Sequence, residues 1–292
     1  MNAPETVVDL LQLPRMGTQL LRAVLTRKRA PADALPQVRL RVQGVRASPE
    51  RLARYRELCG FEVDGALPPT YPQVLAGPLH ATLLGRPDFP HPVMGLVHVR
   101  NHIRQERRLS EGEAYAMSAW FDARREVPAG IELDLTTELE TGGRVVWQAR
   151  TTMLRRVAKA REGERKPRGS EPDAFAASRP ASWQVPGDTG RRYAAVSGDY
   201  NPIHVHALSA RPFGFPRAIA HGMWTLARCV AELGETAQAQ ALTLDCEFRR
   251  PLLLPSQVTF QTLRRGDGVE FRVTSREGKP HLLGALEPAA AD

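Results

Sequence analysis

The sequence predicts an α+β protein in which one arrangement, helices followed by antiparallel strands, occurs twice in a chain of 292 residues. Three observations carry this prediction. The segment 54–60 aligns with 192–198, and in each half apolar residues at helical spacing give way to alternating apolar residues. Each half also contains a glycine turn between two alternating segments, at 142–143 and at 266–268. The length is sufficient for one large domain or for two domains of ordinary size.

The chain begins with an expected N-terminal arm, residues 1–35, which contains one short amphipathic helix over Gln19–Arg27. Alternating apolar residues over 38–45 predict a strand. Ser48, followed by a proline, has the pattern of a helix N-cap, and Gly60 has that of the helix end. A helix between them is therefore expected.

The first copy of the repeat is expected to span residues 36–157. Its second helix opens in the proline-rich segment 67–72, which suits the first turn of a helix. Apolar residues then alternate over 131–139 and again over 145–153, as in strands with one buried face. Gly142 and the glycine after it predict the hairpin turn between them.

A basic linker is expected over residues 158–181, because a segment of this length without periodicity indicates a boundary. Seven Lys or Arg and two Glu lie between Arg155 and Arg168. The charge indicates either a solvated linker or a docking surface for an anionic partner, such as coenzyme A phosphates or an acidic acyl carrier protein. No aromatic platform accompanies it, so nucleic acid is not expected as a partner.

The composition excludes several classes of protein. No apolar run reaches the ~18 residues that a membrane span needs, so no integral membrane contact is expected. Polar residues over 9–15 interrupt any signal-peptide core. The three cysteines are odd in number and lack the spacing of paired metal ligands: Cys59, Cys229 and Cys246. Reduced thiols and a cytoplasmic location are therefore predicted.

The second copy, expected over residues 182–292, contains the stretch on which the functional hypothesis depends. Asp199 and His204 lie five residues apart, and Pro202 between them prevents a regular helix or central strand. A turn of this kind can hold both side chains over one pocket. An acid beside an imidazole suits proton transfer next to a carbonyl.

Three further residues complete the candidate site. A helical apolar pattern starts after Gly222, whose backbone N–H is therefore a candidate oxyanion donor. His221, just before it, is interpreted as structural. Ser197 and Asn201 either orient the acid-bearing turn through side-chain hydrogen bonds or serve only as turn formers. His204 and His206 form a His-x-His pair, but no other spacing indicates a metal site.

The motif Tyr-x-x-x-Ser-Gly-Asp-x-Asn-Pro-Ile-His over 193–204, with Ile-Ala-His-Gly-Met over 219–223, resembles MaoC-like (R)-specific enoyl-thioester hydratases of the hydratase 2 group. The whole layout resembles mycobacterial-type double-hotdog 3-hydroxyacyl-thioester dehydratases. The resemblance is sharp over about 190–255 and looser over about 36–157. It implies a double hotdog fold, in which each copy wraps a curved antiparallel sheet around a long central helix.

The resemblance also implies a hydro-lyase of fatty-acid metabolism that needs no cofactor and no metal. Asp199 and His204 would act on one water, with the Gly222 amide as oxyanion donor and the carboxylate stabilising the imidazolium. Substrates would be thioesters of coenzyme A or an acyl carrier protein, and a homodimer is expected. Phe61 aligns with Asp199, so the first copy would be non-catalytic and shape an acyl channel. Two alternatives remain, a hotdog thioesterase and a non-catalytic acyl-thioester-binding subunit.

Overall fold

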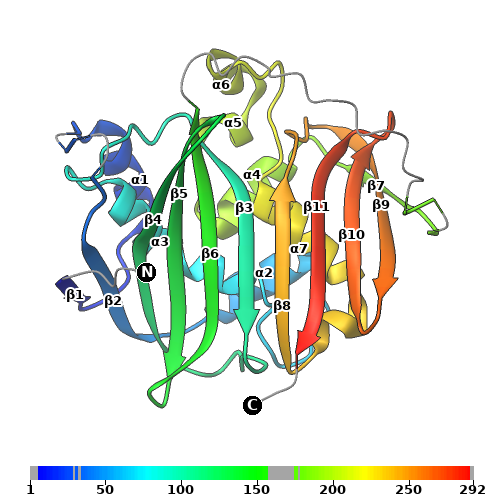
Figure 1. Cartoon of the computed structure of the whole chain (residues 1–292), viewed down its shortest axis with the longest axis horizontal. Helices are drawn as coiled ribbons and strands as arrows, with labels where there is room; N and C mark the ends of the chain where they lie inside the picture. The colour runs from blue at the N-terminus through cyan, green and yellow to red at the C-terminus, as the bar shows by residue number, and fades with distance from the viewer. Residues whose placement is uncertain (1–5, 29, 32–33, 157–173, 177, 290–292) are drawn as a thin grey trace.

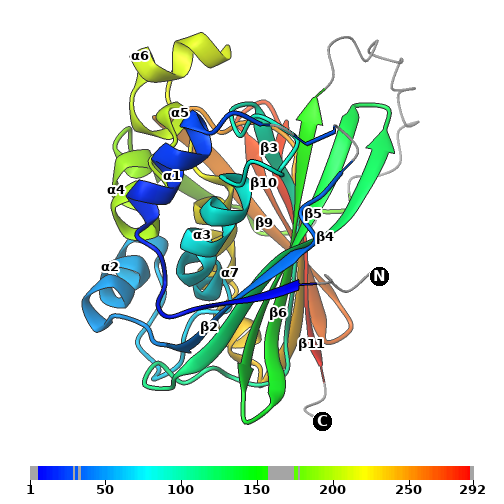
Figure 2. The same cartoon turned by 90° about the vertical axis from the view of Figure 1, so that its left-hand side faces the viewer.

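The computed structural model describes residues 6–28, 30–31, 34–156, 174–176 and 178–289. These residues form one 11-stranded sheet in the order β1-β2-β4-β5-β6-β3-β8-β11-β10-β9-β7. The helices pack on one face of this sheet (Figures 1 and 2). Strands β3 and β8 pair antiparallel, from Arg100 with Glu247 to Gln105 with Leu242, and this pairing joins the two halves.

The elements follow the predicted order in both halves. The N-terminal arm contains β1 (Thr6–Leu10) and α1 (Met16–Leu25). The first half contains β2 (Val38–Val45), α2 (Pro49–Cys59), α3 (Tyr71–Leu84), β3 (Leu96–Gln105), β4 (Tyr115–Val127), β5 (Gly130–Thr141) and β6 (Arg144–Arg156). The second half contains β7 (Ala181–Val185), α4 (Thr189–Ser197), α5 (Pro202–Val205), α6 (Ala207–Ala210), η1 (Arg211–Phe213), α7 (Gly222–Glu232), η2 (Gly234–Gln238), β8 (Ala241–Phe248), β9 (Ser256–Arg265), β10 (Gly268–Ser275) and β11 (Pro280–Ala289).

Each half packs its strands around one apolar helix, α3 in the first and α7 in the second (Figure 2). Leu79 and Leu83 of α3 are fully buried, as are Leu226 and Val230 of α7. Burial of such side chains contributes roughly 1.5–3 kcal/mol each, so each central helix stabilises its own half. This is the α+β, double hotdog architecture that the sequence predicted.

Local signals placed several element ends correctly. The Oγ of Ser48 accepts a hydrogen bond from the Arg51 N–H and caps α2, which ends at Gly60 with φ of 83°. The left-handed backbone conformation favours glycine, because glycine has no Cβ that would clash with the backbone. Helix α4 ends in the same way at Gly198, with φ of 81°. The hairpin turns after β5 and β9 are likewise where the glycines predicted them.

The N-terminal arm differs from the prediction. Strand β1 was not expected, and it pairs parallel to β2 at the edge of the sheet. Helix α1 begins at Met16 and ends at Leu25, earlier at both ends than the predicted 19–27. Most of the expected linker, residues 158–181, lies outside the described residues, and β7 begins at Ala181. Among the described residues, none of the helices combines the length and apolar character needed to span a bilayer.

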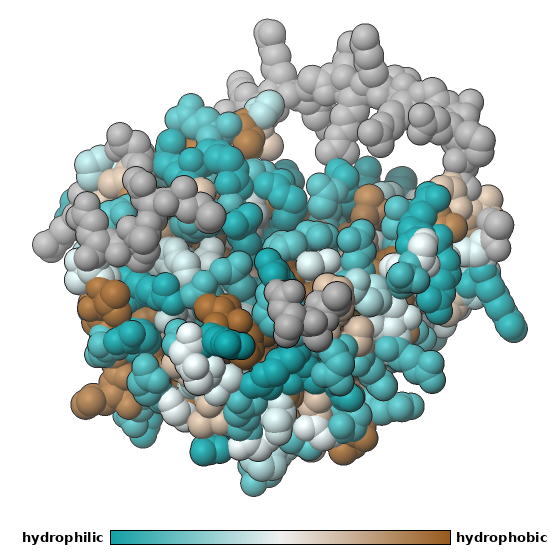
Figure 3. Space-filling view, turned by 60° about the horizontal axis from the view of Figure 1, so that its bottom comes forward, coloured by the Kyte–Doolittle hydropathy of each residue, from teal (hydrophilic) through white to brown (hydrophobic). Residues whose placement is uncertain are grey.

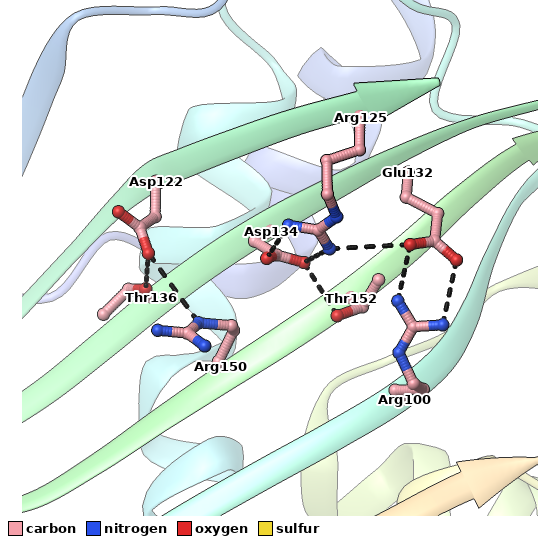
Figure 4. A network of polar contacts seen from close by, with 8 residues as sticks. All are labelled: Arg100, Asp122, Arg125, Glu132, Asp134, Thr136, Arg150 and Thr152. Carbon is pink, nitrogen blue, oxygen red and sulfur yellow. Dashed lines mark hydrogen bonds and ion pairs between the residues drawn. The ribbon is translucent and has the colours of Figure 1, made fainter. Parts of the chain in front are cut away.

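The face of the sheet away from the helices is polar. Glu132 and Asp134 of β5 are only 8% and 3% exposed, yet arginines pair with both (Figure 4). Arg125 donates to Asp134 at 2.6 Å, and Arg100 donates to Glu132 at 2.9 Å. The Arg100 hydrogen bond holds the pKa of Glu132 below its usual value. A hollow of about 790 Å³ opens on this face, but it is lined by neither Asp199 nor its motif partners.

Candidate active site

The acid-bearing turn follows the left-handed end of α4 and is fixed by its own side chains. Ser197 Oγ accepts the Asp199 N–H at 3.2 Å, and Asp199 Oδ1 accepts the Asn201 N–H at 3.1 Å. Asn201 Oδ1 in turn accepts the Ile203 N–H at 3.4 Å and caps α5, which begins at Pro202. These local bonds compete successfully with helix continuation, so the chain bends and presents the Asp199 carboxylate.

His204 lies in α5, and its tautomer follows from one hydrogen bond. Its Nδ1 lies 2.9 Å from the carbonyl oxygen of Ile219. Because a carbonyl only accepts, Nδ1 carries the proton and Nε2 keeps the lone pair. The ring stacks on that of His221, with the centroids 3.7 Å apart and the planes 24° apart. His204 can therefore act as a base through Nε2.

The structure brings Asp199, His204 and His221 into one cluster. One ligand atom from each of the three lies within 4.8 Å of the others. The Nε2 of His221 is 3.0 Å from the Asp199 carbonyl oxygen and 3.8 Å from its Oδ2. The carboxylate and imidazole predicted from the motif are thus close enough to share one water. His221 holds the backbone that carries the acid, as a structural residue would, and its ring also packs against His204.

Burial keeps both imidazoles neutral. It lowers the pKa of His204 below the ordinary value, although the charge of Asp199 acts in the opposite direction. Burial, and then proximity to His204, lowers the pKa of His221 to about 3. The Asp199 carboxylate does favour the imidazolium of His204, as expected, but burial has the larger effect on the pKa and acts against it. A neutral His204 is ready to accept a proton.

Gly222 is the first residue of α7, directly after His221 in the N-cap position. The first N–H groups of a helix lack intrahelical acceptors and carry the positive end of its dipole. A Cβ at Gly222 would lie 2.9 Å from Cε1 of Phe248, closer than real side chains approach. The glycine is thus required by the packing of β8 against the start of α7.

One residue near the cluster comes from the first half and was not foreseen. His98 of β3 packs edge-on against Phe248, with ring centroids 4.8 Å apart. Its Nε2 donates to the Arg100 carbonyl at 2.9 Å. Burial lowers its pKa to about 4, and the charge of Asp199 opposes this. The pairing of β3 with β8 brings His98 next to the second half. Because these strands lie far apart in the sequence, no motif spacing indicates that His98 lies near the cluster.

The geometry separates the His-x-His pair. Nδ1 of His206 accepts the Leu208 N–H at 3.1 Å and caps α6, so it does not join His204. The carboxylate and two imidazoles of the cluster do have the spacing of cation ligands. His204 and His221 each use one ring nitrogen on a backbone carbonyl and keep the other free of that bond. The free nitrogen of His204 and the carboxylate of Asp199 are groups that can transfer protons.

Comparison with known proteins agrees with this class, a hotdog protein with an acid and an imidazole near the amino end of a central helix. The model of the MaoC like domain matches residues 168–282. The 3-hydroxyacyl-thioester dehydratase X of Mycobacterium tuberculosis (strain ATCC 25618 / H37Rv) is 33% identical over 261 residues, which cover 87% of this chain and 90% of that protein. The chain therefore belongs to the MaoC-like dehydratase family.

Solved structures show the same fold along most of the chain. The crystal structure of HtdX from Mycobacterium tuberculosis has a TM-score of 0.74 and 30% identity, and the match covers 86% of this chain and all of that one (100%). A MaoC-like dehydratase from Phytophthora capsici has a TM-score of 0.67 at 18% identity, covering 91% and 97% of the two chains. At this lower identity the likeness concerns the fold alone.

Proposed function

We propose that this protein interconverts (R)-3-hydroxyacyl and trans-2-enoyl thioesters by loss or gain of water. The observation that supports the proposal is the approach of Asp199 and His204 to within 4.8 Å of each other at the start of α7. Membership of a family of dehydratases, and similarity to a 3-hydroxyacyl-thioester dehydratase over 87% of the chain, agree with it. The (R) stereochemistry follows from the resemblance.

In hydration, Asp199 and His204 hold one water between them and remove a proton from it. The hydroxide adds to Cβ of the enoyl thioester while a C–H bond forms at Cα. The proton that left the water returns to Cα through the same pair, so both groups end as they began. Dehydration runs these steps in reverse. Because both groups act from one face, addition is syn.

Negative charge develops on the thioester oxygen when hydroxide adds to Cβ. The N–H of Gly222, at the positive end of α7, is the donor that would stabilise this enolate. Ser197 and Asn201 position the acid through the turn described above, so their role is indirect. Removing a donor of this kind costs ~10²–10³ in rate in other enzymes.

The two halves are proposed to divide the work, with 36–157 shaping the acyl channel and 182–292 performing the chemistry. Phe61, the counterpart of Asp199, stacks on Tyr55 and offers no group for proton transfer. A chain-length profile tests the channel. Efficient turnover of long acyl thioesters is expected, whereas a strict preference for four-carbon substrates would exclude a roomy channel.

The remaining proposals concern partners. The substrate is a thioester of coenzyme A or of an acyl carrier protein, the protein works in the cytoplasm, and two chains form a homodimer. Turnover of matched enoyl thioesters on both carriers tests which carrier the protein uses. Light scattering on the purified full chain tests the homodimer, and a monomeric mass would reject it.

Ultraviolet absorbance of the conjugated enoyl thioester gives the direct test, because the band is lost on hydration. Asp199→Asn is expected to lower kcat/KM by about 10³, within the range for general acid–base groups. Asp245→Asn is the matched control, since this carboxylate pairs with His102 on the other face of the sheet. Release of free thiol instead of loss of absorbance would indicate a thioesterase. Wild-type activity in Asp199→Asn would reject the assignment.

A further inference from the structure

Helix α1 presents apolar side chains to solvent. Leu21, Val24 and Leu25 are 60%, 54% and 72% exposed. At helical spacing these three lie on one face, because residues three and four apart are neighbours. Other apolar side chains also reach the surface, as the brown residues on the left-hand side of Figure 3 show. A single exposed leucine needs no explanation, but an apolar row on one helix does.

Contacts on the opposite face fix this helix in place. Met16 at its start packs against Gly77 of α3 and Gly198 of the acid-bearing turn. Ala23 is buried, and its backbone lies against Gly85 just after α3. Lys28 beyond its end donates to the Leu84 carbonyl at 2.5 Å. With both ends held, α1 cannot turn its outer apolar row inward to bury it.

Cations surround the apolar row. Residues 15–28, which include α1, contain four Lys or Arg and no acidic residue. On or beside α1, Arg15, Arg22 and Arg27 are exposed, and none forms an ion pair with a described residue. An apolar helical face flanked by arginines is the pattern of a helix that lies in the plane of a membrane interface.

We propose that α1 is a peripheral docking surface for anionic lipid membranes, with Leu21, Val24 and Leu25 inserted among the headgroups. A second copy of this chain is a poorer occupant, because a two-fold contact would set the arginines of one α1 against those of the other. A convex helix also offers no groove to a folded acidic protein. This inference does not depend on the dehydratase assignment, since it uses no residue of the cluster.

The test is co-sedimentation of the full chain with sucrose-loaded vesicles of phosphatidylcholine, with or without phosphatidylglycerol. The wild type is expected to pellet with anionic vesicles, and added salt should release it. The triple variant Leu21→Ser/Val24→Ser/Leu25→Ser should lower the partition coefficient at least about tenfold, since each side chain loses insertion energy. The control Val63→Ser/Val145→Ser changes exposed valines elsewhere and should leave partition unchanged.

A second variant, Arg15→Gln/Arg22→Gln/Arg27→Gln, tests the charge separately and keeps the apolar row. Each arginine near an anionic surface is worth about fivefold in partition, so the three together should lower it by roughly a hundredfold. Equal pelleting with neutral and anionic vesicles would overturn the proposal. So would unchanged pelleting of the Ser variant, or a change of its oligomeric mass in light scattering, which would identify a second copy as the occupant.

Discussion

The two halves have the same local structure up to the end of one helix, and they differ from the next residue onward. Helices α2 and α4 both end at a left-handed glycine, Gly60 and Gly198. The next residue is Phe61 in the first half and Asp199 in the second. The scaffold that delivers a side chain to the start of the central helix is therefore present twice, but only one copy delivers an acid.

The surroundings of the two positions differ accordingly. In the first half, Tyr55 stacks on Phe61 at 6.0 Å and meets Tyr71 edge-on at 5.0 Å, while its hydroxyl bonds to Thr70 at 2.8 Å. In the second half the additional residues of the acid-bearing turn form α5, which supplies His204. Aromatic side chains pack at the first position, and a polar turn carries the acid at the second. Repetition of a fold thus does not imply repetition of its chemistry.

Outside the Asp199 and His204 pair, the largest expected effect concerns the helix start in the second half. Gly222→Ala places a Cβ 2.9 Å from Phe248, so the helix start must shift and the oxyanion donor moves with it. We expect kcat/KM to fall by about a hundredfold. The double variant Gly222→Ala/Phe248→Leu should recover part of the loss, because the smaller side chain makes room. Gly112→Ala, where nothing lies within 4 Å, is the control.

The pH dependence of stability tests the buried histidines. Burial lowers the folded-state pKa of His80 and His221 to about 3 and that of His98 to about 4. An unfolded imidazole titrates near ~6.5, so below that pH the unfolded chain binds more protons. The free energy of unfolding should therefore be flat above about pH 6.5 and fall below it, by up to ~1.4 kcal/mol per pH unit for each histidine.

Urea denaturation at a series of pH values measures this slope. His80→Gln retains a polar side chain that can reach Thr137. It should reduce the slope of the unfolding free energy against pH by the contribution of one histidine. Constant stability from pH 7 down to pH 4.5 would show that these rings are solvated, contrary to the account. His80 and His98 belong to the first half and His221 to the second, so the slope reports on both halves.

The smallest expected effect lies in the aromatic cluster of the first half. Tyr55→Phe removes the hydrogen bond between the hydroxyls of Tyr55 and Thr70. Both residues are fully buried, at 0% exposure. The free energy of unfolding should fall by about 1 kcal/mol, as for a typical buried hydrogen bond. Activity should remain within a factor of about two, because no step of the proposed reaction uses this cluster. A large loss of kcat/KM with little loss of stability would reveal a catalytic role for the first half.

Local signals in the sequence were enough to predict much of the fold. Ser48 and Gly60 mark the two ends of α2, and the glycines at 142–143 form the turn between β5 and β6. Such caps and turns could be predicted because they depend on neighbouring residues in the sequence. Strand β1 escaped prediction since its partner β2 lies far along the chain and the pairing is parallel. The place of His98 also escaped prediction, because β3 pairs with β8, which lies far along the chain.

The residues of the candidate site could be predicted from the sequence, but their protonation states could not. Asp199 and His204 were named from their motif, and the structure brings them together. The neutral state of His204 could not be foreseen, because it depends on how deeply the ring is buried. The close stacking of His221 on His204 also depends on the tertiary path from α5 to α7.

The central claim is that Asp199 and His204 act as one unit on a shared water. A double-mutant cycle of Asp199→Asn and His204→Gln, followed by enoyl-thioester absorbance, tests it most directly. Each single replacement should cost about 10³ in kcat/KM, and the double variant should be hardly worse than either, as for residues that act together. Losses that multiply in the double variant, or either single variant retaining wild-type turnover, would contradict a shared water.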